Sequence, residues 1–119
     1  MRVILFSILF CFGLYAQESS YESFLVKVAE DKVKVITPKT KDKIVTIIIE
    51  NKTFERIISE VRSDKKVLKR FTLEPEGNRG ANFSLTVDFS KVDKLFYVSV
   101  SPPFQAVPLE LKGKNYEIP

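Results

Sequence analysis

The sequence predicts an all-β domain, folded as a Greek-key sandwich of about seven to eight strands. Short runs rich in Val, Ile, Phe and Tyr recur along the chain, and clusters of Gly, Pro, Asn, Asp and Ser separate them. Residues 82–89 alternate strictly between polar and apolar side chains, which indicates a half-buried strand of an antiparallel sheet. Many short strands within about 100 residues are typical of two sheets packed face to face.

The N-terminal segment has the layout of a secretory signal peptide. Arg2 supplies a positive charge, residues 3–15 are mostly apolar, and Ala16 offers a small residue for cleavage. The apolar run is shorter than the roughly 20 residues of a membrane-spanning helix; an uncleaved anchor and a buried strand are the alternatives. We therefore expect a secreted or periplasmic protein with a signal peptide at 1–16, a flexible lead-in at 17–22 and a β-sandwich domain at 23–119.

Cysteine usage fits export. The only cysteine, Cys11, lies within the expected signal peptide. A lipoprotein signal would place small residues directly before that cysteine, whereas Leu9 and Phe10 stand there, so lipid attachment is disfavoured. A chain cut after Ala16 contains no cysteine, and its stability must come from burial rather than from disulfides.

The expected domain begins with a hairpin. Residues 24–28 and 33–37 carry alternating apolar side chains on either side of a turn at 29–31. Residues 38–42 form a charged linker whose Pro38 ends the second strand.

A nearly unbroken apolar run at 44–49 predicts a central strand that is buried on both faces. Ile44 and Ile48 would face one side of the sheet, and Val45, Ile47 and Ile49 the other. The outer side then needs a cover. We expect the C-terminal segment 116–118 or Lys and Arg stems to supply it, with another protein chain as the alternative.

The second half of the chain predicts five more strands. Residues 54–63 fit either a helix face or a strand, and a strand is favoured because Ile and Val dominate. The segment at 107–111 contains Pro108, which cannot donate to a ladder and therefore predicts an edge strand. The other strands are expected at 67–73, 82–89 and 95–100, with a short one within 113–119.

One short segment resembles a known family. Residues 93–100, DKLFYVSV, resemble the tyrosine corner of immunoglobulin and fibronectin type III domains. The paired cysteines and core Trp of antibody domains are absent, so the resemblance concerns the architecture. It implies an immunoglobulin-like Greek-key sandwich in which the Tyr97 hydroxyl bonds to upstream backbone.

Composition excludes several kinds of chemistry. The chain has no His, and its Met and Cys lie in the expected signal peptide, so the usual zinc, blue-copper and haem ligand sets are missing. Ser-His-Asp and Cys-His nucleophile arrangements are excluded for the same reason. A Ser-Lys dyad is possible by composition, but no motif supports one. We expect no enzymatic activity and no cofactor.

Carboxylates offer one weak metal candidate. Oxygen ligands from Glu74, Glu76, Asn78 and Asp88 could hold a calcium ion. Their spacing matches no established calcium loop, and the same residues are typical of a plain surface turn. The turn is the favoured interpretation.

Basic residues form clusters, at Lys39, Lys41 and Lys43, and at Lys65, Lys66, Lys69 and Arg70. The simple interpretation is solvated side chains that keep the domain soluble and blunt strand edges. The alternative is attraction of the second cluster to an anionic lipid or glycan surface. Nucleic acid is not expected as a partner, since the chain has no Trp and no basic stripe interleaved with aromatic residues.

Protein binding is the favoured function. Pro102 and Pro103 stiffen a loop that carries Phe104, which serves either as an anchor for a partner or as a plug for the end of the sandwich. We expect an interaction module that binds another envelope or extracellular protein, or a second copy of itself, through Phe104 or an open sheet edge. The alternative function is binding to an anionic glycan or membrane surface. Asn51 and Asn82 begin glycosylation sequons.

Overall fold

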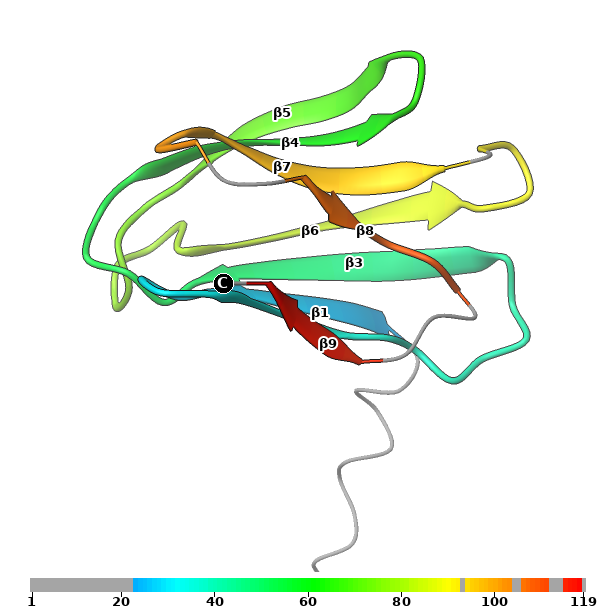
Figure 1. Ribbon diagram of the computed structural model, residues 1–119, viewed down its shortest axis with the longest axis horizontal. Helices are drawn as coiled ribbons and strands as arrows, with labels where there is room; N and C mark the ends of the chain where they lie inside the picture. The colour runs from blue at the N-terminus through cyan, green and yellow to red at the C-terminus, as the bar shows by residue number, and fades with distance from the viewer. Residues whose placement is uncertain (1–22, 93, 104–105, 112–114, 119) are drawn as a thin grey trace, which may run out of the picture.

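The structure is a computed structural model that describes residues 23–92, 94–103, 106–111 and 115–118. These residues form nine β-strands in two layers and contain no helix (Figure 1). The all-β, two-layer prediction is therefore confirmed. The strands are β1 (Ser23–Val28), β2 (Val33–Ile36), β3 (Ile44–Asn51), β4 (Ile57–Ser63), β5 (Val67–Leu73), β6 (Asn82–Asp88), β7 (Leu95–Ser101), β8 (Val107–Pro108) and β9 (Tyr116–Ile118).

The strands divide into a five-stranded sheet, in the order β6-β3-β1-β2-β9, and a four-stranded sheet, in the order β5-β4-β7-β8. From β3 to β7 the chain crosses between the sheets three times, so that β6 pairs with β3 and β7 pairs with β4. All these pairs are antiparallel, whereas β1 lies parallel to β3. β8 ends its sheet, so the edge position predicted from Pro108 is confirmed.

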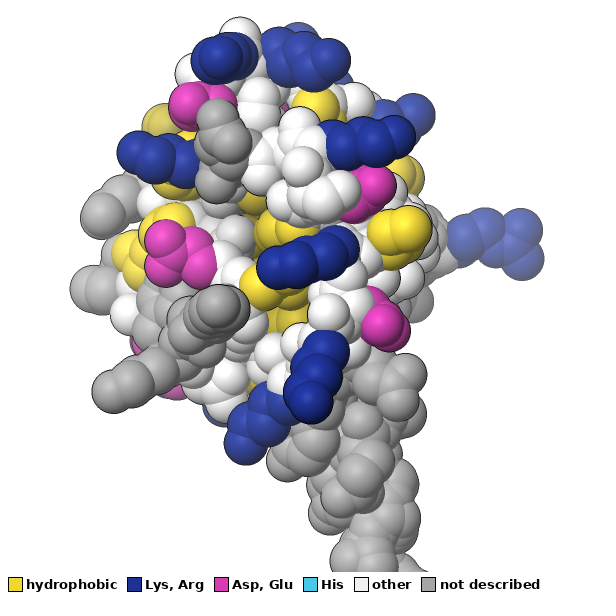
Figure 2. Space-filling model, turned by 90° about the vertical axis from the view of Figure 1, so that its right-hand side faces the viewer, with side chains coloured by type: hydrophobic (Ala, Val, Ile, Leu, Met, Phe, Trp, Pro, Cys, Tyr) yellow, Lys and Arg dark blue, Asp and Glu magenta, His cyan; other side chains and the backbone are white. Residues whose placement is uncertain are grey.

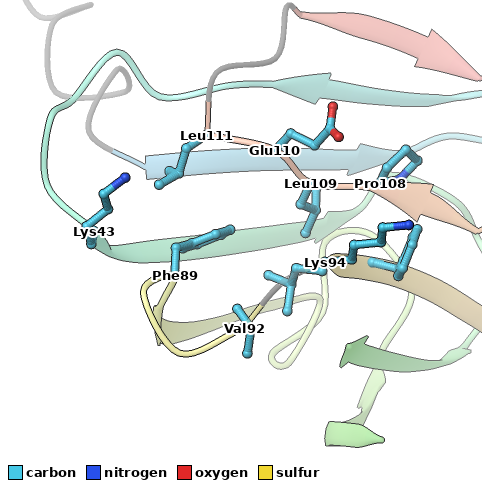
Figure 3. Close-up of a pocket in the computed structure, with 10 residues that line it drawn as sticks. Lys43, Phe89, Val92, Lys94, Pro108, Leu109, Glu110 and Leu111 are labelled. Carbon is cyan, nitrogen blue, oxygen red and sulfur yellow. The ribbon is translucent and has the colours of Figure 1, made fainter. Parts of the chain in front are cut away.

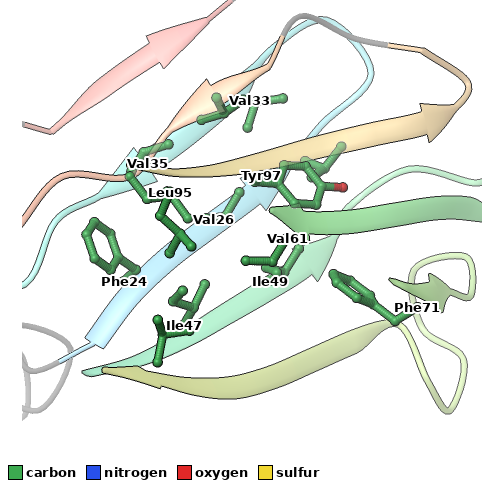
Figure 4. Packing of buried hydrophobic residues seen from close by; sticks show 14 of the residues in the cluster. Phe24, Val26, Val33, Val35, Ile47, Ile49, Val61, Phe71, Leu95 and Tyr97 are labelled. Atoms are coloured by element: carbon green, nitrogen blue, oxygen red, sulfur yellow. The ribbon is translucent and has the colours of Figure 1, made fainter. Parts of the chain in front are cut away.

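The core lies between the two inner faces (Figure 4). Every second residue of a strand points inward, as Val45, Ile47 and Ile49 do on β3. Phe71 of β5 stacks on Phe83 of β6 with ring centroids 4.2 Å apart, which joins the sheets along one side. Each fully buried aliphatic side chain contributes roughly 1.5–3 kcal/mol, so this layer is the main source of stability.

The central strand is not buried on both faces as predicted. Ile44 is 63% exposed, and Ile48 is half-buried on the outer face of β3. The C-terminal strand does not cover them, because β9 extends the sheet beyond β2 instead of lying over β3. Ile48 is flanked by its cross-strand neighbours Leu25 and Ser84, so the sheet itself supplies part of the cover.

The ambiguous segment 54–63 forms a strand from Ile57, as favoured. Phe54 belongs to the preceding connection and is 81% exposed. Within the described residues there is no helix long and apolar enough to cross a lipid bilayer.

Tyr97 does not form a tyrosine corner. Its hydroxyl lies in the core and forms a 2.8 Å hydrogen bond with Ser59 Oγ on the neighbouring strand β4, not with upstream backbone. Burial raises the pKa of Tyr97 to about 12, and the bond to Ser59 offsets a part of that shift. Tyr97 therefore links β7 to β4 within one sheet through a buried side-chain hydrogen bond.

The connections gather at two ends of the sandwich. We call one the lysine-rich end, formed by residues 37–43, 64–66, 89–92, 94 and 109–111, and the other the closed end, formed by residues 29–32, 52–56, 74–81 and 102–103. β1 starts at the lysine-rich end, since Ser23 pairs with Thr46 near the start of β3.

A hydrogen-bond network holds the closed end together. The buried Asn51 amide donates to the carbonyl oxygens of Glu55 and Glu74, at 2.7 and 2.9 Å, and its Oδ1 accepts from the backbone and hydroxyl of Thr53, at 2.8 and 2.7 Å. The Glu76 N–H donates to the Thr53 carbonyl oxygen. One side chain thus fastens the β3–β4 connection to the β5–β6 loop.

Candidate functional site

Lysines from three separate connections meet at the lysine-rich end. In Figure 2, Lys and Arg side chains surround hydrophobic ones on this face of the molecule. The lysines of the described connections are Lys39, Lys41, Lys43, Lys65, Lys66, Lys91 and Lys94, and the carboxylates among the described residues there are Asp42, Asp64, Asp88 and Glu110. Positive charge therefore prevails at this end.

Several of these lysines have no carboxylate partner among the described residues. Among the described residues, no ion pair within 4 Å involves Lys43, Lys65, Lys66 or Lys94. At the closed end, the Nε of Arg56 lies 3.1 Å from a Glu74 oxygen. Exposed ammonium groups without a carboxylate partner are free to contact an external anion.

The structure divides the basic patch predicted at 65–70. Lys65 and Lys66 occupy the β4–β5 turn at the lysine-rich end, and Lys69 is exposed along β5. Arg70 instead donates from Nε to Glu60 on β4, at 2.9 Å. The Glu60 side chain is only 6% exposed although it points outward, because Arg70 and Arg62 lie over it.

A cavity of about 410 Å³ opens between the sheets at the lysine-rich end (Figure 3). Leu95 and Leu109 are buried at its base, and the half-buried Phe89, Val92 and Leu111 line its sides. The remaining lining residues are Phe96, Pro108, Lys43, Lys94 and Glu110.

The connections that frame this cavity are fixed by the strands. Phe89 N–H donates to the Lys43 carbonyl oxygen at 2.7 Å, and Leu109 N–H donates to the Leu95 carbonyl oxygen at 2.9 Å. Behind the cavity, Phe89 stacks on the buried Phe24 with centroids 5.6 Å apart. The cavity is thus continuous with the core, and backbone hydrogen bonds hold two of its lining residues, Phe89 and Leu109, in place.

The four calcium candidates do not come together. Asp88 ends β6 at the lysine-rich end, whereas Glu74, Glu76 and Asn78 lie in the loop before β6 at the closed end, about 20 Å away by strand length. Glu74 and Glu76 pair with Arg56 and Lys52, and the Asn78 amide donates to the Pro75 carbonyl oxygen. No cluster of three potential metal ligands occurs within the described residues.

Asp88 has a local role in the turn after β6. It accepts hydrogen bonds from the hydroxyl of Ser90 at 2.6 Å and from its backbone N–H at 3.0 Å. These bonds lower the pKa of the Asp88 carboxyl, and the charge of Lys91 adds to the effect.

The proline loop lies at the closed end. Ser99 Oγ donates to the carbonyl oxygen of Pro102, and Pro103 is exposed. Phe104, the predicted anchor, lies outside the described residues. The sequons also differ, because Asn51 is buried with its amide engaged, whereas Asn82 is exposed.

The cavity was not predicted from the sequence, although large apolar residues are present in segments that separate strands, namely Phe89, Val92, Leu109 and Leu111. Comparisons with known protein families, characterised proteins and solved structures gave no significant match. The evidence for a function therefore comes from the site alone.

Proposed function

We propose that this protein is a non-enzymatic, secreted or periplasmic domain that binds an anionic surface through its lysine-rich end. The observation that carries the proposal is the convergence onto one face of Lys43, Lys65, Lys66 and Lys94, which come from separate connections and have no ion pair with a described residue. Each Lys near an anionic membrane contributes about 1 kcal/mol of attraction, so several together support stable attachment.

A lipid surface fits this end better than a glycan. Ile44, which is 63% exposed, follows Lys43 along the chain, and Lys43 also lines the cavity together with Phe89 and Leu111. Apolar side chains next to lysines match the boundary between lipid head groups and acyl chains. A polysaccharide would use the charges and leave the apolar groups in water.

The domain is, in this proposal, immunoglobulin-like. The β3–β6 and β4–β7 pairs, with repeated crossings between the sheets, support that architecture. The parallel β1–β3 pair and the Tyr97–Ser59 bond are the features of this chain that depart from the immunoglobulin pattern.

Vesicle sedimentation tests the proposed function. The protein should bind phosphatidylglycerol vesicles at low salt and phosphatidylcholine vesicles hardly at all, and binding should vanish near 1 M salt, where the Debye length is about 3 Å. Lys65→Gln combined with Lys66→Gln should weaken binding about 30-fold, as two lysines at about 1 kcal/mol each imply.

The matched control is Lys32→Gln with Lys52→Gln, which removes the same charge at the closed end. This variant should bind almost like the wild type. Equal losses in both double variants, or binding that salt does not affect, would refute a specific lysine-rich surface. An acidic polysaccharide resin in place of vesicles distinguishes glycan from lipid.

A second candidate function is protein binding, which the outer face of the four-stranded sheet supports. Ile58 and Val100 are neighbours there, and each is 38% exposed. A partner or a second copy that covers them would bind with little salt dependence. Sedimentation of the wild type and of Ile58→Lys at high salt tests this, since an interface there should be lost in the variant.

A further inference from the structure

The cavity at the lysine-rich end combines features that a flat surface-binding site does not require. Its volume of about 410 Å³ lies within the range of roughly 300–1,000 Å³ that is typical of small-molecule sites. Leu109 and Leu95 place it directly on the core, and it opens to solvent between two connections. A ligand that enters it therefore contacts mainly apolar side chains.

The polar groups of the cavity are confined to a few residues. Lys43, Lys94 and Glu110 are the charged residues among its described lining, and all are exposed. The lysines outnumber the carboxylate, and neither lysine has an ion pair with a described residue. Their long stems can cover apolar surface while the ammonium groups meet an anion at the opening.

We propose that this cavity binds one alkyl chain that ends in an anionic head group. The chain lies against Phe89, Leu109 and Leu111, and the head group meets Lys43 and Lys94. Mainly apolar lining side chains together with two lysines are complementary to such a molecule, whereas a cationic head group would meet repulsion from the lysines.

The inference deepens the proposed function and rests on it in one respect, since both use the lysine-rich end. They differ in the residues that carry them. Lys65 and Lys66 serve attachment to a surface but do not line the cavity. Leu111 lines the cavity but is uncharged, so it does not contribute to attraction toward an anionic surface. The two proposals can therefore fail separately.

Calorimetric titration with soluble alkanoates, from octanoate to tetradecanoate below their micelle concentrations, provides the first test. Affinity should rise about fourfold per added methylene, which corresponds to about 0.8 kcal/mol per CH₂, until the cavity is filled. Dodecyl phosphate should bind like dodecanoate, and dodecyltrimethylammonium at least tenfold more weakly. An affinity independent of chain length, or equal for anion and cation, would overturn the proposal.

Substitutions provide the second test. Leu111→Gln should reduce dodecanoate affinity at least tenfold, whereas Leu68→Gln, a half-buried apolar position outside the cavity, should leave it unchanged. Lys43→Gln with Lys94→Gln should bring anion and cation closer in affinity. If Leu111→Gln binds dodecanoate like the wild type, the assigned cavity is wrong.

The outcome for vesicles separates the two proposals. If wild-type binding to vesicles depends on Lys65 and Lys66 but dodecanoate shows no saturable binding, the surface function stands and the cavity ligand is refuted. If dodecanoate binds and vesicles do not, the cavity ligand stands without the surface function. Circular dichroism of each variant verifies that it is folded.

Discussion

The two ends of this sandwich differ in how their charged side chains are paired and in how far their connections are linked by hydrogen bonds. At the closed end, Lys52 and Arg56 pair with carboxylates, and the Asn51 amide bonds to two connections. At the lysine-rich end, Lys43, Lys65 and Lys94 have no ion pair with a described residue, and a cavity lined mainly by apolar side chains faces solvent. The difference indicates that stability is concentrated at one end, while the other end keeps unsatisfied groups that a ligand can use.

The largest effect is expected from Asn51→Ala. It removes the amide that bonds to Glu55 and Glu74 and leaves the buried Thr53 N–H without its acceptor, so we expect a loss of about 3 kcal/mol in the free energy of unfolding. Urea denaturation measures this. Asn82→Ala, at the exposed sequon, is the control and should change stability by less than about 0.5 kcal/mol. A similar small change in both would contradict the role of the closed end.

Tyr97→Phe should have an intermediate effect that is independent of either end. At neutral pH the lost bond to Ser59 Oγ should cost about 1 kcal/mol.

The loss of unfolding free energy caused by Tyr97→Phe should become smaller at high pH. The pKa of Tyr97 is raised to about 12 in the folded state, whereas tyrosine in an unfolded chain ionises near pH 10. From pH ~10 to ~12 the unfolded state has lost a proton that the native state retains, so the tyrosine's contribution to stability falls across that window. Urea unfolding of both proteins from pH 8 to 11 checks this, and curves that stay parallel would disprove the raised pKa.

A smaller effect, of opposite sign at the two ends, is expected from removing lysine pairs. Lys65→Gln with Lys66→Gln relieves repulsion and should raise stability by a few tenths of a kcal/mol, up to about 0.5 kcal/mol, at low salt. Lys32→Gln with Lys52→Gln removes ion pairs to Glu117 and Glu50 and should lower it slightly. Thermal denaturation at low and high salt measures both, and equal signs would remove the electrostatic difference between the ends.

The smallest effect concerns the carboxylate of Asp88. Ser90→Ala removes the hydroxyl bond that does most to lower the pKa of Asp88, so that pKa should rise toward 3.8. Because the folded-state pKa is lowered, this interaction stabilises the protein above pH ~3.9 and is lost as the pH falls through the folded value. An NMR titration of the carboxyl measures the change. Ser84→Ala, on the exposed face of β6, should leave the pKa where it is.

The strands were predictable because their signals are local. Alternation placed β6 almost to the residue, and the proline at 108 gave the edge position of β8. The prediction that β3 is buried on both faces was wrong because its outer apolar residues do not need another layer over them. Ile44 stays exposed at the end of the strand, and Ile48 is shielded by neighbours on its own sheet.

The candidate site was less predictable because it depends on which connections share an end. Lys43, Lys65 and Lys94 are far apart in the sequence, and their meeting follows from the antiparallel registers of β3–β6 and β4–β7. The resemblance to a tyrosine corner misled for a related reason. Tyr97 was placed by its neighbours along the chain, whereas its hydrogen-bond partner Ser59 comes from an adjacent strand.

The pairing of β9 with β2 has a consequence for how the domain matures. The β2 edge of the five-stranded sheet is completed by one of the last described segments, with Val33 opposite Ile118. During synthesis, that edge keeps unpaired amide and carbonyl groups until residues 116–118 have been made. Lys34, which is exposed on β2, places a charge at that edge. This charge disfavours pairing with a strand of another protein chain before β9 has formed.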